Sequence, residues 1–413
     1  MSVIDKNRMN YSFQGNESNK ILPTDLSIIP FDNNKYSSET TMTFTMSSGK
    51  YFVDPDKSYL NIDVGVAGTG VDALKVNFGT GSALNLFSGI RIYHRSGTQI
   101  THSVNTDLWS KAKQTITKDA FWFSSQGKVQ GYVTTPTTDF LWTTNSADFE
   151  VHKFKIKLVD LHPFFKGTDD KILPPQIADG LRIELDLNPK YRDFFGVAGS
   201  SGIVDYEIQN PSIQTALVDV QPSASDLTND IANKRGVEWT FNDVHMTTIT
   251  IDTNENNFNV PVEKAVSSAQ NILTFSRDRD SDNSLLEDSH KYTEPIIAGG
   301  KTEWNYRVGN VLYPFRRKVS SQVDSYTTLL DAFNWQYGTN ITLDEWKDNN
   351  AVYATNLLTE DRLLSSGEYL NANKRVELEF SKDVNSQFVR YVHSCLEYTK
   401  VLTANSTNSK IDE

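Results

Sequence analysis

The amino-acid sequence predicts an all-β protein made of two β-sandwiches in tandem, with a few short helices. Three observations lead to this prediction. Apolar residues alternate with polar ones over many short segments, turn-rich spacers separate these segments, and one strand pattern occurs twice. The chain has 413 residues, which at ~150 residues per domain corresponds to two or three domains. A compact chain of this length needs no disulfide or metal to hold it together.

The alternating segments each have one apolar face and one polar face, because successive side chains of a strand point to opposite sides. Strands of this one-sided kind are typical of antiparallel sheets. The segments are 60–66, 90–93, 153–158, 181–187 and 375–380. Spacers rich in glycine and serine, which favour turns, lie at 47–49, 65–70, 196–202 and 299–300.

Helices are predicted only over 107–113, 325–333 and 342–347. The last begins with Thr342 and Glu345 at the spacing of a capping box, in which each side chain bonds the other's backbone N–H. Many strands with few helices favour sandwiches or barrels.

The strand pattern that occurs twice is Arg-Ile-Glu-Leu-Asp-Leu at 182–187 and Arg-Val-Glu-Leu-Glu-Phe at 375–380, an offset of 193 residues. A six-residue strand pattern can recur by chance. If the recurrence is a true repeat, the chain holds two units of nearly 200 residues, each the size of one sandwich. The predicted division is an N-terminal arm 1–38, a first sandwich 39–222, a linker 223–236, a second sandwich 237–401 and a C-terminal tail 402–413.

Four segments together resemble the double jelly-roll major capsid proteins of DNA viruses, of the type found in polinton-like viruses and virophages. These are 47–66, with an Asp-Pro turn between strands, 83–111, 158–188 with its Phe-Phe and Leu-Pro pairs, and 363–380. The resemblance implies that each sandwich is a jelly roll. It also implies a structural protein, not an enzyme, that forms trimers of nearly hexagonal outline and tiles an icosahedral shell.

The resemblance further implies a set of partners and a location. The partners are two further copies in a homotrimer, neighbouring capsomers, minor and penton capsid proteins, and a membrane or other proteins beneath the shell. The location is the virion capsid, assembled in the host cytoplasm or nucleus. The terminal segments 1–38 and 402–413 are expected to be extended arms that order only against neighbours or a membrane. Outward loops are expected at 65–81, 125–148 and 276–310.

Charge argues against a protein that coats nucleic acid, because the formal net charge is −12, from 40 Lys and Arg against 52 Asp and Glu. Direct sequence-specific binding of nucleic acid is therefore not expected. The N-terminus lacks the apolar stretch of a secretory signal, and no run of ~18 apolar residues predicts a membrane helix. The single cysteine, Cys395, indicates a reducing compartment such as cytosol or nucleus.

Two acidic residues on one strand face, Glu184 and Asp186, have a spacing that suits glycoside hydrolysis. The corresponding glycosidase motif has a third acid two residues on, where this chain has Asn188. Because the same pattern recurs at Glu377 and Glu379, we interpret both pairs as solvated strand faces.

A possible calcium loop begins at Asp278, Asp280 and Asp282. A complete loop needs glycine sixth and glutamate twelfth, and these places hold Asn283 and Ser289. An acidic surface loop is the favoured interpretation, with a weakly bound cation as the alternative.

Histidine and cysteine do not form a metal or nucleophile motif. Only His393 lies near Cys395, and two donors do not complete a zinc site. Cys395 could act as a nucleophile with a distant histidine, but its apolar strand predicts a buried, inert thiol. The other histidines are His94, His102, His152, His162, His245 and His290.

The glycine clusters lack the Gly-Lys-Ser/Thr ending of a phosphate loop. The basic run 315–318, with Arg316 and Arg317, is either solvated or contacts a phosphate or a neighbour's acidic edge. We therefore predict no catalytic residue, no cofactor and no metal site.

The alternative from another class is a carbohydrate-binding or carbohydrate-active β-sandwich protein. It is favoured by 7 Trp, 17 Tyr and 22 Phe, since aromatic platforms stack on sugars, although these residues are spread along the chain. A viral spike or minor capsid protein is a third interpretation.

Overall fold

The computed structural model describes most of the chain. The described residues are 20–21, 26–28, 34–69, 74–79, 81–133, 139–144, 150–167, 172–189, 194–196, 203–220, 222–279, 302–314, 317–333, 338–347, 351–358, 367–372, 374–383, 385, 389–405 and 408–413. Asp280, Asp282, His290 and Arg316 lie outside them, as do most of the residues of the predicted loop 276–310.

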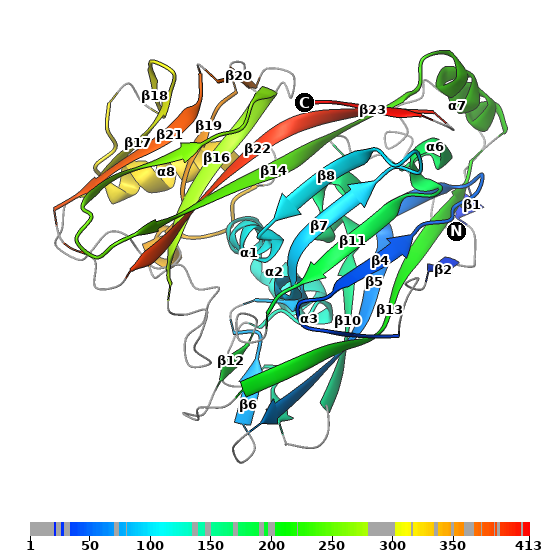
Figure 1. Cartoon of the computed structure of the whole chain (residues 1–413), viewed down its shortest axis with the longest axis horizontal. Coiled ribbons are helices and arrows are strands. Elements are labelled where there is room, and N and C mark those ends of the chain that lie inside the picture. The colour runs from blue at the N-terminus through cyan, green and yellow to red at the C-terminus, as the bar shows by residue number, and fades with distance from the viewer. Residues whose placement is uncertain are drawn as a thin grey trace.

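The first sandwich, strands β1–β13, pairs a six-stranded sheet with a four-stranded one (Figure 1). The larger sheet has the order β1-β13-β5-β10, and β2 and β3 also pair with β13. Its strands are β1 (Lys20–Ile21), β2 (Leu26–Ile28), β3 (Lys35–Ser37), β5 (Phe52–Thr69), β10 (Glu150–Lys157) and β13 (Ile203–Asp219). The smaller sheet has the order β4-β11-β7-β8, with strands β4 (Thr41–Thr45), β7 (Phe87–Tyr93), β8 (Gln99–Val104) and β11 (Arg182–Leu187).

The second sandwich, strands β14–β23, has the same plan. Its six-stranded sheet has the order β14-β22-β16-β19, with β20 on β16 and β23 on β22. These strands are β14 (Val237–Ile251), β16 (Val266–Asp278), β19 (Tyr353–Asn356), β20 (Glu368–Leu370), β22 (Arg390–Ala404) and β23 (Ser409–Asp412). Its four-stranded sheet has the order β15-β21-β17-β18, with strands β15 (Asn257–Val262), β17 (Thr302–Val308), β18 (Val311–Tyr313) and β21 (Val376–Lys382).

The strand pattern that occurs twice in the sequence occupies equivalent positions in the two sandwiches. β11 lies between β4 and β7, and β21 lies between β15 and β17. Along both strands, buried residues alternate with less buried ones. The recurrence is therefore structural, and every strand pair described is antiparallel, as the one-sided alternation predicted.

The structure contains the three predicted helices and several more that were not predicted from the sequence. α1 (Thr106–Thr117), α8 (Gln322–Phe333) and α9 (Leu343–Lys347) were predicted, and the capping box forms: the N–H of Glu345 donates to Thr342 Oγ1 at 3.3 Å and that of Thr342 to Glu345 Oε2 at 2.8 Å. The others are η2 (Ala83–Leu86), α2 (Ala120–Ser124), α3 (Gln126–Val129), α4 (Leu158–Leu161), α5 (Pro163–Lys166), α6 (Pro175–Ala178) and α7 (Pro222–Lys234).

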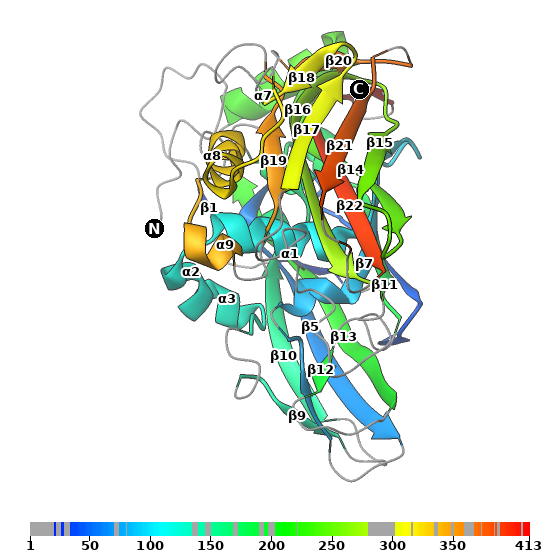
Figure 2. The ribbon, with the colours of Figure 1, turned by 90° about the vertical axis from the view of Figure 1, so that its left-hand side faces the viewer.

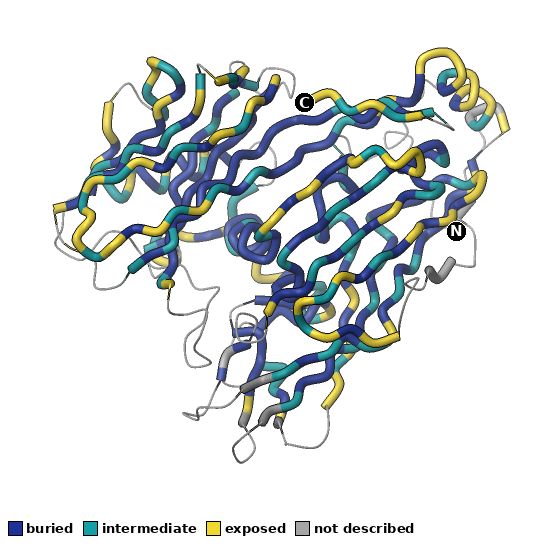
Figure 3. The backbone as a smooth tube through the Cα atoms, in the orientation of Figure 1, coloured by how far each residue is buried: buried dark blue, intermediate teal, exposed yellow. Residues whose placement is uncertain are grey.

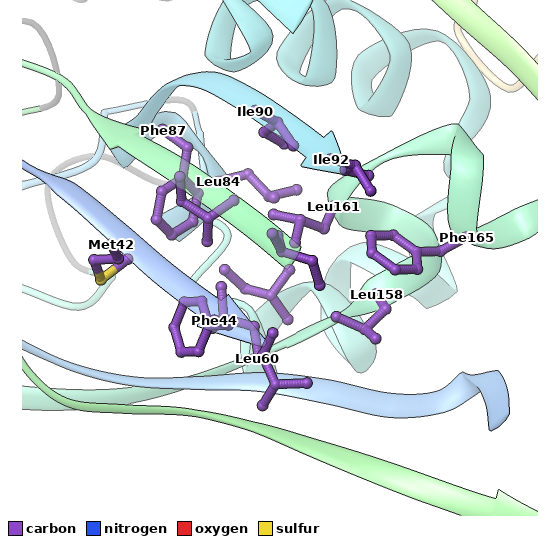
Figure 4. Packing of buried hydrophobic residues seen from close by; sticks show 14 of the residues in the cluster. Met42, Phe44, Leu60, Leu84, Phe87, Ile90, Ile92, Leu158, Leu161 and Phe165 are labelled. Atoms are coloured by element: carbon purple, nitrogen blue, oxygen red, sulfur yellow. The ribbon is translucent and has the colours of Figure 1, made fainter. Parts of the chain in front are cut away.

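Each sandwich has an apolar core between its two sheets. Figure 4 shows the first core, where Phe44 of β4 and Ile90 of β7 face Leu60 of β5. Leu158 and Phe165, from α4 and α5, pack beside them. No helix among the described residues is long and apolar enough to cross a membrane.

A small third sheet extends the first sandwich and has no counterpart among the described strands of the second. It has the order β12-β6-β9, with strands β6 (Leu74–Asn77), β9 (Trp142–Thr144) and β12 (Phe195–Gly196). Its core is aromatic: the ring of Phe78 lies 5.1 Å from Trp142 and 5.6 Å from both Phe154 and Phe194, measured between ring centroids.

Four expectations differ from the structure. The predicted spacer 65–70 is strand through Thr69, because Gly65 pairs with Val151 on one side and Glu207 on the other. The predicted linker 223–236 holds helix α7, which begins with Pro222 and carries an Asp230–Lys234 ion pair at 2.7 Å. Proline suits the first turn of a helix because its missing N–H has no partner there anyway.

The terminal segments are the third difference, because their described parts pair within the chain. Residues 402–404 complete β22, and β23 pairs with β22. The described strands β1, β2 and β3 all pair with β13. The described parts of both segments are therefore strands of the chain's own sheets.

The Asp-Pro segment expected as a turn is a bulge within β5. Asp54 pairs with Ala216 and Tyr59 with Gln214, so four residues of β5 face one of β13. Ser58 Oγ donates to the Asp54 carbonyl at 2.7 Å and accepts from the Ala216 N–H at 3.0 Å. The side chain of Ser58 thus replaces ladder hydrogen bonds that the bulge interrupts.

Candidate functional site

The two sandwiches meet at a buried junction to which both contribute core residues. β14 and β22 of the second sandwich run over onto the first, beside β8 (Figure 1), where Trp239, Phe241 and Leu402 join the first core. In return, Leu108 and Trp109 of α1 belong to the second core. Figure 3 shows α1 buried along its length at the centre of the molecule. The sandwiches therefore share apolar surface in both directions.

Two hydrogen-bonded contacts fix this arrangement. Trp239 Nε1 donates to the Phe164 carbonyl in α5 at 2.9 Å. Asn340 of the second sandwich donates from its backbone N–H to the Ile116 carbonyl and from Nδ2 to the Thr117 carbonyl, both at 2.8 Å. These carbonyls are among the last four of α1, which have no partner within the helix. The second sandwich thus caps a helix of the first.

Asp243 of β14 is the centre of a buried polar cluster in the junction. The residue is 1% exposed. Its Oδ1 accepts from Thr101 Oγ1 at 2.7 Å and from Ser103 Oγ at 3.2 Å, both in β8. Its Oδ2 accepts from the Tyr398 hydroxyl at 3.3 Å. A carboxylate of the second sandwich is therefore bound by two hydroxyls of the first.

Lys400 supplies the balancing charge. Its ammonium lies 2.8 Å from Asp243 Oδ2 and 2.7 Å from Glu413 Oε1, and it donates to the Ile100 carbonyl at 3.3 Å. Glu413 also binds Lys264 at 2.8 Å. The residue Lys400 is 5% exposed, so its pairing with Asp243 takes place away from water, whereas the Glu413 side chain is 35% exposed. We call Thr101, Ser103, His162, Asp243, Lys400 and Glu413 the junction cluster.

Ser103, His162 and Asp243 look at first like a catalytic triad. The His162 Nδ1 accepts the Phe164 N–H at 3.1 Å, so the proton of the neutral ring sits on Nε2. His162 Nε2 lies 3.0 Å from Ser103 Oγ, which itself donates to Asp243. In a triad, the histidine accepts the serine proton and the aspartate holds the other ring nitrogen. Here the hydrogen bonds run the opposite way, so the arrangement cannot activate Ser103.

The pKa values of the cluster follow from opposing effects. Burial alone would raise the pKa of Asp243, but His162, whose Nε2 lies 3.6 Å from Asp243 Oδ1, and the charge of Lys400 outweigh it and hold that pKa far below its usual value. Burial alone would lower the pKa of Lys400, and Asp243 reverses this and raises it. Burial would also raise the pKa of Glu413, which its bonds to Lys264 and Lys400 lower. All three groups are therefore charged at neutral pH.

A second charge, the partly buried Lys113 of α1, lies near Glu397 of the second sandwich. Burial lowers the pKa of Lys113 to about 8, and the nearby Glu397 of β22 partly offsets this. The Lys113 ammonium also lies 4.5 Å from the centroid of the Trp109 ring.

The ion pairs of Asp243, Lys400 and Glu413 lie within the second sandwich. The bonds that cross the junction are those of Asp243 to Thr101 and Ser103 and that of Lys400 to the Ile100 carbonyl. Separation of the sandwiches would remove these partners from two charged groups that are buried together.

The acidic strand faces identified in the sequence are ion-pair ladders. Glu184 lies 3.2 Å and Asp186 2.6 Å from the guanidinium of Arg91 on the neighbouring strand. In the second sandwich, Arg307 binds Glu379 from Nε at 2.6 Å and faces Glu377 in the strand register. Each face carries its own arginine, which agrees with the interpretation as solvated strand faces.

The other described candidate residues from the sequence are not part of the junction cluster. Cys395 is buried, and burial raises the pKa of its thiol well above the usual value, which disfavours the reactive thiolate. His393 bonds Thr248 at 2.9 Å and accepts from Arg277 at 3.0 Å. Asp278 ends β16, while its calcium-loop partners Asp280 and Asp282 lie outside the described residues. Arg317 is exposed and lies 3.8 Å from Asp324.

The described residues contain no group of three or more His, Cys, Asp or Glu side chains placed to hold a metal ion. All described tryptophans are at most 9% exposed: Trp109, Trp122, Trp142, Trp239, Trp304 and Trp346. A sugar-stacking platform needs an exposed ring face, so these tryptophans do not favour the carbohydrate alternative. Trp335 lies outside the described residues.

The junction cluster was not identified from the sequence. Its signal is weak but present: Asp243 and Lys400 each interrupt a strand that is otherwise rich in apolar and uncharged residues. A charged residue at such a position is rarely buried unless it is paired. The sequence does not show which residue is the partner.

No protein-family model matches the chain, and no curated protein matches its sequence. Solved structures do. The whole chain resembles the Faustovirus major capsid protein, with a TM-score of 0.66 and 9% identity over 96% of this chain and 92% of that one. It resembles the mavirus major capsid protein with a TM-score of 0.57 and 11% identity, over 98% of this chain and 93% of that one. It resembles a chain of the PBCV-1 virus capsid with a TM-score of 0.64 and 9% identity, over 98% of this chain and 99% of that one. The predicted fold, two tandem jelly rolls, is thereby confirmed.

Proposed function

We propose that this chain is a structural major capsid protein, a subunit that forms trimers and tiles the shell of an icosahedral virion. The observation that supports this best is the duplicated roll with its buried junction, matched along almost the whole chain to the Faustovirus and mavirus major capsid proteins. The function is assembly, and no catalytic residue, cofactor or metal is part of the proposal.

The geometry suits a trimer. Each chain presents two similar sandwiches side by side (Figure 1). Three chains around a three-fold axis would place six sandwiches in a ring, and a nearly hexagonal ring packs into a continuous layer. Closed rotational symmetry is the rule for homo-oligomers, and obligate interfaces of this kind typically bury more than ~2,000 Å².

The two repeats of the proposed subunit are residues 39–222 and 237–401, connected by the segment that holds α7. The junction keeps them in one orientation. Its buried ion pairs have their hydrogen-bonding partners only when β8, β14 and β22 are together. A fixed angle between the repeats is what a regular shell requires of its subunit.

The proposed partners are other proteins, since the net charge of −12 disfavours direct contact with the genome's phosphates. They are neighbouring trimers, minor and penton capsid proteins, and a membrane or further proteins beneath the shell. The proposed location is the virion, with assembly in the host cytoplasm or nucleus.

The test is the mass of the purified protein by multi-angle light scattering, followed by negative-stain imaging at high concentration. A trimer has a mass of about 140 kDa, three times 46.6 kDa, and is expected to form particles or hexagonal arrays. A protein that stays at 46.6 kDa at every concentration, with no arrays, would contradict the proposal.

A further inference from the structure

Glu397 of β22 is a buried carboxylate with few bonds. The residue is 1% exposed, and its Oε2 accepts a long hydrogen bond of 3.4 Å from Asn271 Nδ2 of β16. Its Oε1 has no hydrogen-bond partner in the part of the chain that the structure describes. Removing a carboxylate from water is costly unless its oxygens are bonded or its charge is paired. A further partner for Oε1 is therefore expected.

An opposite charge approaches Glu397 from the other side of the junction. α1 of the first sandwich lies next to the strands of the second in both Figure 1 and Figure 2, and its Trp109 belongs to the second core. Among the charges that act on Lys113 of α1, Glu397 most strongly offsets the effect of burial on the pKa of this lysine. The Lys113 ammonium does not bond Glu397 Oε1. The two charges therefore attract each other without a direct bond to this oxygen.

A second donor of α1 lies beside Lys113. Trp109 is one helical turn earlier, and the Lys113 ammonium lies 4.5 Å from the centroid of its ring. The residue Trp109 is 4% exposed, and its Nε1–H has no hydrogen-bond partner among the described residues. Trp109 shares its apolar core with Val244 of β14, which faces Glu397 in the strand register. α1 therefore brings a cation and an unbonded N–H to the layer that holds Glu397.

A second acceptor lies beside Glu397 on the sheet. Asn242 of β14 is 5% exposed, and its Oδ1 has no hydrogen-bond partner within the described ranges. Asn242 pairs with Thr399, which is two residues from Glu397 along β22. Side chains at such diagonal positions lie on the same face of a sheet, roughly 7 Å apart. The second sandwich therefore presents two acceptor oxygens side by side.

The two sides are complementary. α1 presents donors, the Lys113 ammonium and the Trp109 Nε1–H, and the sheet presents acceptors, Glu397 Oε1 and Asn242 Oδ1. We call these four residues the bridging site. Buried polar groups that lack a protein partner typically bind water, and polar groups that face each other beyond bonding distance are the usual place for a bridging water. Lys113 is only partly buried, so water can reach the site from that end.

Other small ligands suit only one of the two sides. A metal cation would bind the carboxylate and the amide oxygen, but the Lys113 ammonium repels it and the indole N–H cannot bind it. An anion would accept from both donors, but the buried carboxylate of Glu397 repels it. Water accepts from one side, donates to the other and carries no charge. The set of donors and acceptors therefore favours water over an ion.

We propose that ordered water occupies the bridging site and links the two sandwiches there. The water accepts from α1 and donates to β14 and β22, so that Lys113 and Glu397 form a water-mediated pair. The junction then has two kinds of polar contact, direct bonds around Asp243 and water-mediated bonds around Glu397. This inference goes beyond the proposed function and does not depend on how copies of the chain assemble.

The first experiment is an experimental structure of the full chain at a resolution that shows ordered water. We expect a density peak about 2.7–3.2 Å from Glu397 Oε1 that also lies within hydrogen-bond distance of Lys113 Nζ or Trp109 Nε1. A direct bond between Lys113 and Glu397 Oε1, or the absence of a peak between them, would overturn the inference. A peak at the distances of about 2.3–2.6 Å typical of a bound calcium ion would overturn it as well.

The second experiment tests whether Lys113 and Glu397 share the site. Glu397→Gln removes the charge and keeps an acceptor, and the matched control Glu379→Gln removes a carboxylate from the ladder of β21. The readout is the rate at which acetic anhydride modifies Lys113 at neutral pH, followed by mass spectrometry of the folded protein. In Glu397→Gln the pKa of Lys113 should fall below its value of about 8, and the rate should rise about threefold or more.

The control should react at the wild-type rate. An unchanged rate in folded Glu397→Gln would refute the shared site. A Glu397→Gln chain that does not fold leaves the inference open to refutation, because the first experiment uses the wild-type protein.

Discussion

The junction cluster and the surface ladders use the same chemistry in different surroundings. In the junction, Asp243 is 1% exposed and bound by Lys400 together with hydroxyls of the other sandwich. In the ladder of the first sandwich, the side chains of Arg91 and Asp186 are 29% and 30% exposed. Water screens the ladder and not the cluster. Carboxylates that look alike in the sequence therefore contribute very differently to the structure.

The two sandwiches each have a ladder, whereas the junction cluster forms where they meet. Both sandwiches keep a ladder on the strand that the repeat defines, β11 and β21, with an arginine on the neighbouring strand. The junction cluster is buried because the first sandwich covers the charges of the second. Each ladder forms between strands of one sandwich, whereas the junction cluster needs residues of both.

The largest expected effect is that of Asp243→Ala. This change leaves the buried Lys400 with only the partly exposed Glu413 as its carboxylate partner and should lower the free energy of unfolding by about 3–5 kcal/mol. The ladder control Asp186→Ala should lower it by about 1 kcal/mol or less. Urea denaturation measures both. Equal losses in the two variants would show that burial does not separate the cluster from the ladder.

Acid should weaken the junction in a defined direction. The pKa of Asp243 is lower in the folded chain than its usual value of 3.8, so the unfolded chain takes up a proton first. The stability that this group contributes is present above about pH 4 and is lost as the pH falls further. Glu413 acts in the same direction.

The measurement is the free energy of unfolding from pH 7 to pH 3, compared with the variant Asp243→Asn. The variant should show a shallower loss of stability below pH 4. Identical slopes would indicate that other groups control the acid response.

A double variant, Asp243→Asn/Lys400→Met, sharpens the comparison further. It removes both charges while leaving an acceptor for Thr101 and Ser103 at position 243. Replacing a buried ion pair as a unit is often close to neutral, so we expect a loss of about 1–2 kcal/mol in urea. A loss as large as that of Asp243→Ala would mean that the charges themselves, and not the unpaired partner, determine stability.

The smallest expected effects are those of Arg91→Ala and Arg307→Ala. Each removes one surface ladder and should cost about 0.2–1 kcal/mol, with a smaller cost at high salt. Thermal unfolding at low and high salt tests this. If one variant were far more damaging than the other, the two ladders would not be equivalent.

Much of the fold follows from the sequence pattern, and the junction does not. Alternation predicted the strands around Ile62, Ile156 and Ile183 because one face of each was visibly apolar. The repeat predicted that β11 and β21 occupy the same place. The continuity of β5 through Gly65 was missed, since glycine indicates a turn unless strands pair on both sides of it, and only the three-dimensional structure shows that pairing.

The candidate site was harder to predict for a similar reason. Asp243 and Lys400 are charges in strands made mostly of uncharged residues, and the partners Thr101 and Ser103 are ordinary strand residues. Their importance comes from the contact between the sandwiches, which depends on how one unit lies on the other. The polar composition of 223–236 likewise suggested a linker, although Pro222 and the Asp230–Lys234 spacing suit the helix that forms.

The central claim is that the chain is a duplicated sandwich made to fit against copies of itself. Class averages of the purified particle, viewed along its symmetry axis by electron microscopy, test it most directly. We predict a three-fold particle with six lobes of similar size around the axis. Particles with only two lobes, or with an axis that relates whole chains without bringing their sandwiches into a ring, would contradict the account.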